Sequence, residues 1–175
     1  LGVCSKYKEP LAGADGRAGR FGHVASDTIY FLKKNYNFSE NIVFLGFSKG
    51  GTRSQDWVSG AFADKFDFFL KKLKKDDIVI DYVLWHQGES ENKDANRIYY
   101  QNYINDMQLI FQKFLTISKK TKIGMALVSI CESEKSKSLI NSQRSIIQSN
   151  DRVFFTLNTC LLYTSPIPRY DGVSR

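Results

Sequence analysis

Short apolar runs rich in β-branched and aromatic residues alternate along this chain with longer segments whose apolar residues recur every three or four positions. The short runs predict strands at 42–47, 78–85, 123–130 and 153–157. The longer segments predict helices at 27–37, 61–74, 94–118 and 138–148. Strands and helices that alternate in this way form a parallel sheet covered by helices, so the sequence predicts an α/β fold.

The charge and the composition exclude several kinds of protein. The net charge is +7, but the lysines cluster at predicted helix ends without an arginine-rich stripe, which favours solvated helix ends over nucleic-acid binding. No apolar run is long enough to predict a membrane segment. The cysteines are odd in number and far apart, so they predict neither a disulfide framework nor a metal site: Cys4, Cys131 and Cys160.

Two polar segments, 46–57 and 85–91, each follow the end of a predicted strand. Parallel sheets bind their ligands at the carboxyl ends of the strands. Gly50 and Gly51 allow backbone N–H groups to approach a ligand closely, and the side-chain amide of Gln87 is a hydrogen-bond donor that does not titrate. We therefore expect these two loops to stabilise a negatively charged oxygen, as acyl transfer requires.

The two loops together resemble a known family. The motif W-H-Q-G-E-S at 85–90, preceded by G-G-T-x-x-x-x-W at 50–57, is similar to the sialate O-acetylesterase and acetylxylan-esterase-like branch of the SGNH hydrolases. The resemblance covers about Pro10 to Thr159. It implies a flavodoxin-like three-layer α/β/α fold with a parallel sheet, incomplete in this chain. It also implies a serine esterase that removes O-acetyl groups from carbohydrates of the sialate or xylan type, with no metal and no organic cofactor.

The resemblance also implies roles for individual residues. The backbone N–H of Gly50 or Gly51 and the amide of Gln87 would form the oxyanion hole. The remaining motif residues would shape the pocket or support the loops: Trp57, His86 and Glu89. The family's nucleophile stands in a G-Q-S-N-like motif and its base in a D-x-x-H motif, and this sequence contains neither. We therefore expect the chain to be a piece that lacks both parts and is unstable and inactive by itself. The sequence does not indicate its compartment.

The final segment, 160–175, resembles the translation of a transposase-based sequencing adapter. Its first residues, C-L-L-Y-T-S-P, match that translation, and Ile167 departs from it. We therefore expect one partial hydrolase domain at 1–159, followed by a tail of non-biological origin that carries no function.

Other functions stay open on the sequence alone. Ser48 lies in a G-x-S-x-G pattern, which is the nucleophile elbow of α/β-hydrolases, although polar residues follow where that fold has an apolar helix. His86 is a candidate general base, and Glu89 with Glu91 is a candidate glycosidase acid pair. A third alternative is a carbohydrate-binding relative without catalysis. The acetylesterase remains the first prediction, because only it explains both motifs.

Overall fold

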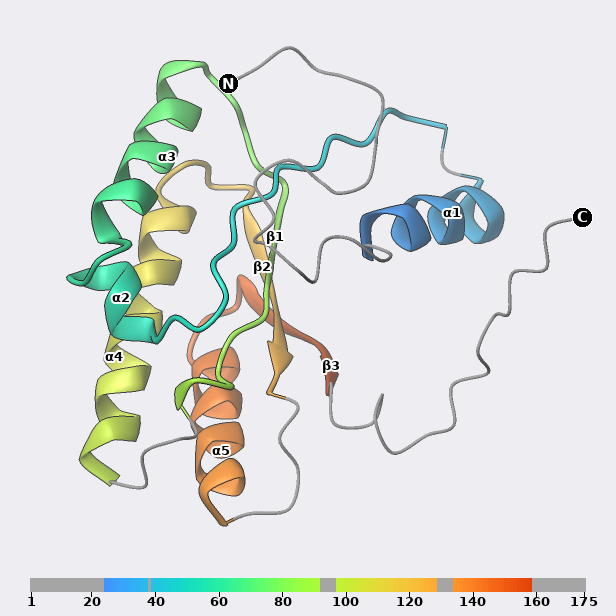
Figure 1. Ribbon diagram of the computed structural model, residues 1–175. Coiled ribbons are helices and arrows are strands. Elements are labelled where there is room, and N and C mark those ends of the chain that lie inside the picture. The colour runs from blue at the N-terminus through green and yellow to red at the C-terminus, as the bar shows by residue number, and fades with distance from the viewer. Residues whose placement is uncertain (1–23, 38, 92–96, 129–133, 159–175) are drawn as a thin grey trace, which may run out of the picture. The chain divides into compact units, whose positions relative to one another are not determined.

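The computed structural model describes residues 24–37, 39–91, 97–128 and 134–158. The chain divides into two compact units, Leu1–Gly51 and Thr52–Arg175. In the first unit, helix α1 (Val24–Tyr36) is drawn in blue in Figure 1, and residues 39–49 after it form neither helix nor strand. The helix predicted in this part of the chain is therefore confirmed.

The strand predicted at 42–47 is not formed in the structure. A strand is stable only where a neighbouring strand completes the ladder of backbone hydrogen bonds, and a local sequence pattern does not supply that neighbour. The prediction was wrong because β-rich composition is a local property, whereas membership of a sheet is not.

The described part of the second unit contains the sheet and the helices that precede and connect its strands (Figure 1). Its elements, in chain order, are α2 (Ser54–Val58), α3 (Ala63–Lys75), β1 (Tyr82–Trp85), α4 (Arg97–Leu115), β2 (Lys122–Leu127), α5 (Glu134–Gln148) and β3 (Val153–Asn158). The other predicted helices and strands are therefore confirmed, with shifted boundaries. Helix α2 was not predicted, because five residues are too few to show a helical period.

The three strands pair in the order β1-β2-β3, and both pairs are parallel. Trp85 is the register partner of Met125, which in turn pairs with Phe155. Helix α4 connects β1 to β2, and α5 connects β2 to β3, as parallel neighbours require. The parallel α/β fold class is confirmed, as an incomplete form of the three-layer arrangement.

The predicted strand at 78–85 begins only at Tyr82. Before it, Ile80 O accepts a hydrogen bond from Thr121 Oγ1 at 2.7 Å, and Asp81 O accepts one from Lys122 N at 2.9 Å. These contacts attach the residues before β1 to the residues around the start of β2. One of them uses a side chain, so the regular ladder begins later than the apolar run.

Aromatic side chains join α2, α3, α4 and β1 into one core. The ring of Phe66 lies 5.1 Å from that of Phe114 and 5.6 Å from that of Trp57, measured between centroids. Trp57 also packs edge-on against Trp85 at 5.4 Å. Such tilted and edge-on pairs are favourable beyond the apolar area that they bury. This cluster holds the helices against the end of β1, where the first polar loop residues follow.

The position of Phe66 at the centre of this cluster predicts a large loss of stability on truncation. Phe66 is fully buried, whereas Phe68 on the same helix is 70% exposed. We expect Phe66→Ala to lower the free energy of unfolding by about 3–5 kcal/mol, because it removes buried area and leaves a cavity. Phe68→Ala is the matched control and should change it by less than about 0.5 kcal/mol. Urea unfolding of both variants in the product of the complete gene measures this, and equal losses would contradict the assigned core.

Candidate active site

Gln87 lies two residues beyond the end of β1, and its side chain is buried. The amide nitrogen Nε2 donates to Glu91 Oε1 at 2.9 Å and to the backbone oxygen of Thr52 at 3.3 Å. The amide oxygen Oε1 is also buried, and it has no hydrogen-bond partner in the described part of the chain. The side chain therefore connects the loop after β1 to the turn before α2.

Glu91 carries a fully buried carboxylate, with 0% of the residue exposed. Its Oε1 accepts hydrogen bonds from the backbone N–H of Ser54 and from Gln87 Nε2. Its own backbone N–H donates to Gly88 O at 3.0 Å, which closes the turn. Burial raises the pKa of the Glu91 carboxyl, and the two donors oppose that shift.

A second carboxylate approaches the same turn from α4. Ser54 Oγ donates to Asp106 Oδ2 at 2.9 Å, while the N–H of Ser54 donates to Glu91. Partial burial raises the pKa of Asp106. At the same end of α2, Arg53 N donates to Asp56 Oδ2 at 2.8 Å and satisfies a backbone donor at the helix start. Side-chain contacts therefore hold the first turn of α2 on both sides.

Gln143 of α5 ties two strand ends together. Its Oε1 accepts from Val128 N at 3.0 Å, just beyond β2. Its Nε2 donates to the backbone oxygen of Gln87 at 3.0 Å and to Tyr103 Oη at 3.1 Å. Tyr103 lies on α4, and burial raises the pKa of its phenol. One buried amide thus sets the backbone position of Gln87 relative to β2 and α4.

Gly88 has a backbone conformation that favours glycine, with φ at +144°. A Cβ at this position would lie 3.0 Å from Gln143 Nε2 and 3.2 Å from Val128 Cβ. The glycine in the W-H-Q-G-E motif therefore permits the close approach of α5 and β2 to the loop after β1.

His86 and Glu89 pair with each other on the surface of the same loop. His86 Nε2 lies 3.1 Å from Glu89 Oε1, and the two side chains are 47% and 42% exposed. The hydrogen bond to Glu89 raises the pKa of the His86 imidazole above its ordinary value, although burial opposes this. The pair therefore connects two positions of the loop, which suits loop support.

Trp57 is buried, and its indole Nε1 donates to Thr52 Oγ1 at 3.0 Å. The ring packs on Phe62 at 4.9 Å, in addition to the core contacts described above. This geometry makes Trp57 a brace for the turn between Thr52 and α2.

Gly50, Gly51 and Ser48 belong to the first unit. Gly51 has φ at +75°, and no atom lies within 4 Å of a Cβ built there. Its backbone thus needs the conformational freedom of glycine but not its small size. Ser48 is exposed and follows residues that form no strand, whereas a nucleophile elbow joins a strand directly to a helix.

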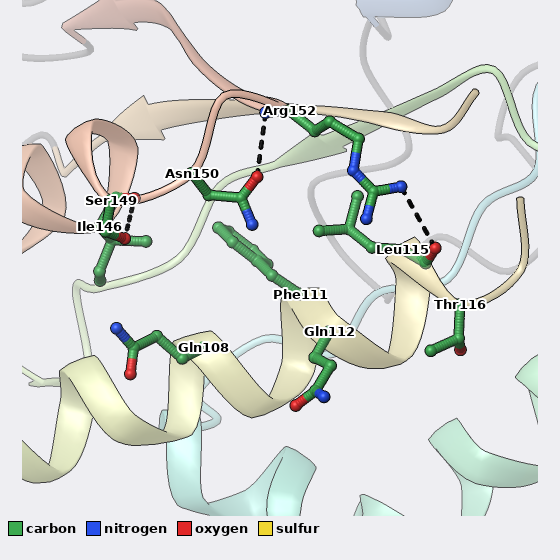
Figure 2. Close-up of a pocket in the computed structure, with 9 residues that line it drawn as sticks. All are labelled: Gln108, Phe111, Gln112, Leu115, Thr116, Ile146, Ser149, Asn150 and Arg152. Carbon is green, nitrogen blue, oxygen red and sulfur yellow. Dashed lines mark hydrogen bonds between the residues drawn. The ribbon is translucent and has the colours of Figure 1, made fainter. Parts of the chain in front are cut away.

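A groove of about 500 Å³ lies between the C-terminal parts of α4 and α5 (Figure 2). Arg152 Nη1 donates there to the backbone oxygen of Leu115 at 3.4 Å, and Asn150 Oδ1 accepts from Arg152 N at 2.9 Å. Arg152 directly precedes β3, so the groove lies beside the amino end of that strand. Gln87 follows the carboxyl end of β1, and the groove is therefore separate from the candidate site.

Sequence reasoning named Gln87 and missed the residues that hold it: Glu91, Gln143, Tyr103, Ser54 and Asp106. Glu91 was considered only as half of a glycosidase pair. The apolar spacing of the helix predicted at 94–118 includes Tyr103, but no pattern identifies the hydrogen-bond partner of its hydroxyl group. The adapter-like tail and the cysteines lie outside the described residues.

Across the described residues, no three His, Cys, Asp or Glu side chains gather where they could hold a metal ion. None of the helices there combines the length and apolar character that a membrane span needs.

A parallel sheet with polar loops at the carboxyl ends of its strands defines an α/β protein of the kind that binds ligands at that edge. A family model described as carbohydrate esterase, sialic acid-specific acetylesterase, matches residues 7–161. The chain belongs to this family of carbohydrate esterases, and the resemblance seen in the two motifs is confirmed. No curated protein and no solved structure matched the chain.

The two motif glycines predict different losses of stability. Gly88→Ala introduces both backbone strain and a contact with Gln143, so we expect it to lower the free energy of unfolding by about 2–3 kcal/mol. The Cβ of Gly51→Ala meets no other atom. We therefore expect the free energy of unfolding to fall only by the cost of the backbone conformation, about 1 kcal/mol. Urea unfolding compares the two variants. A smaller loss for Gly88→Ala than for Gly51→Ala would contradict the packing described here.

The His86–Glu89 pair predicts a change in pKa. We expect Glu89→Gln to lower the pKa of His86, because it removes the partner that raises it. The stabilisation from the pair is fully present below the ordinary histidine pKa of 6.5, and it is lost as the pH rises through the higher pKa of the folded state. An NMR titration of the His86 ring protons measures this. Asp76→Asn, directly after α3, is the control, and an unchanged His86 pKa in Glu89→Gln would contradict the pairing.

Proposed function

We propose that the complete protein is a serine esterase that removes O-acetyl groups from carbohydrates of the sialate or xylan type. The observation that carries the proposal is the buried amide of Gln87, held with its N–H groups presented at the carboxyl end of β1. Family membership supports the acyl chemistry. No metal or organic cofactor is part of the proposed reaction.

The proposed oxyanion hole uses one N–H of Gln87. An Nε2 group has two hydrogens, and the contact to Thr52 O, at 3.3 Å, is the longer of its two hydrogen bonds. That hydrogen is the one most easily redirected to the oxygen of a tetrahedral intermediate. The backbone N–H of Gly50 or Gly51 is the second donor in this proposal, and it rests on the motif alone. Trp57, His86 and Glu89 support the two loops.

The nucleophile and the base of the proposed reaction lie outside this chain. A serine attacks the ester carbonyl, a histidine takes its proton, and water then releases acetate. The chain by itself is proposed to be inactive, with 1–159 as a partial domain and 160–175 as an adapter-derived tail. Reading the complete gene tests this part. A G-Q-S-N motif upstream and a D-x-x-H motif in place of the tail are expected.

Removal of the proposed oxyanion donor tests the mechanism. In the product of the complete gene, we expect Gln87→Ala to lower kcat for an acetylated sugar about 10²- to 10³-fold, with little change in KM, because the lost contact forms in the transition state. Gln101→Ala, at an exposed glutamine of α4, is the matched control and should retain activity. Equal kcat values for the wild type and Gln87→Ala would overturn the role of Gln87.

Two further measurements separate the rival functions. Ser48→Ala should leave kcat unchanged. A loss of activity in this variant would favour an α/β-hydrolase. An active-site serine reagent should label the complete protein. Sugar binding without labelling would favour a non-catalytic carbohydrate-binding relative.

A further inference from the structure

The proposed reaction assigns no role to the carboxylate of Glu91. It is fully buried, and the same oxygen accepts from Gln87 Nε2 and from Ser54 N. These donors come from the two segments that carry the family motifs. Ser54 begins α2, three residues after Gly51, and Gln87 follows β1. One oxygen atom therefore contacts both segments.

An ionised carboxylate selects one edge of the neighbouring amide. A glutamine side chain can present either its NH₂ group or its oxygen, but a carboxylate oxygen only accepts hydrogen bonds. At 2.9 Å from Glu91 Oε1, the favoured group of Gln87 is NH₂. The opposite orientation would place two oxygen atoms against each other in a buried space, which is strongly unfavourable. Glu91 thus favours, together with the backbone oxygen of Thr52, the orientation in which Gln87 points a donor toward the Thr52 turn.

The two hydrogens of Gln87 Nε2 are held unequally. The bond to Glu91 is charge-assisted and short, whereas the bond to Thr52 O is neutral and longer, at 3.3 Å. The first bond anchors the amide, and the second hydrogen is the one for which a substrate oxygen can compete. A donor fixed before the reaction stabilises developing charge better than one that must reorient.

We propose that Glu91 is a positioning residue that orients the amide of Gln87 as the oxyanion donor. This inference rests on the proposed esterase function and extends it to a residue that does not touch the substrate. Because Glu91 acts through Gln87, its contribution to kcat should exist only while Gln87 is present.

A double-mutant cycle in the product of the complete gene tests this coupling. Glu91→Met keeps the size of the side chain and removes the acceptor, and we expect kcat to fall about 10- to 100-fold while KM stays within about threefold. In a Gln87→Ala background, the same substitution should change kcat by less than about threefold. An equal fall in both backgrounds is the result of a merely structural role and would overturn the proposal.

Two further variants complete the cycle. Glu91→Gln keeps an acceptor oxygen, and it should restore kcat to within about fivefold of the wild type. Ile123→Val removes a methyl group from a fully buried side chain of β2, and it should lower Tm without changing kcat. Should Glu91→Met fail to fold, Glu91→Asp takes its place in the cycle, because the shorter side chain withdraws the acceptor from Gln87.

A measurement without turnover separates this inference from the esterase proposal. In ¹⁵N-labelled protein, the side-chain NH₂ signals of Gln87 are identified by their loss in Gln87→Ala. We expect their hydrogen exchange to be slow in the wild type and faster in Glu91→Met. Unchanged exchange would overturn the positioning role even if the enzyme is active. A wild type that does not hydrolyse acetyl esters would overturn the proposed function, while slow exchange that depends on Glu91 would still establish the contact.

Discussion

The hydrogen bonds accepted by one buried carboxylate hold together the polar end of this sheet. Glu91 joins the N–H of Ser54 to the amide of Gln87. Burial of a carboxylate is unfavourable unless donors satisfy it, so removal of either donor would leave a poorly compensated charge. Both loops must therefore keep their positions together, which is the condition that a shared active site imposes.

Neutral amides complete this arrangement around the carboxylate. Gln143 holds the backbone of Gln87 against the end of β2, and Gln87 in turn contacts the turn at Thr52. Amides supply donors and acceptors that do not change with pH. The carboxylates of Glu91 and Asp106 both accept hydrogen bonds from Ser54, and burial raises the pKa of both carboxyl groups. The geometry of the proposed donor is thus determined by few charged groups.

Family membership and local geometry support different parts of the functional argument. The matched family places the chain among carbohydrate esterases, whereas the hydrogen bonds of Gln87 support the role proposed for its amide. The aromatic cluster around Trp57 and Trp85 connects the two segments that carry the motifs. It packs the start of α2 against the end of β1, so that motif residues 28 or more positions apart in sequence meet across the core.

The sequence by itself determined the alternation of strands and helices and the parallel fold class, and its motifs made Gln87 a candidate site residue, because periodicity and motif spacing are local properties. Only the tertiary structure decided that the run at 42–47 forms no strand and that β1 begins at Tyr82. It also decided that Glu91 is buried while Glu89, two residues before it, pairs with His86 at the surface. Two glutamates in one loop look alike in sequence. Their roles differ because burial and hydrogen-bond partners come from distant segments that only folding brings together.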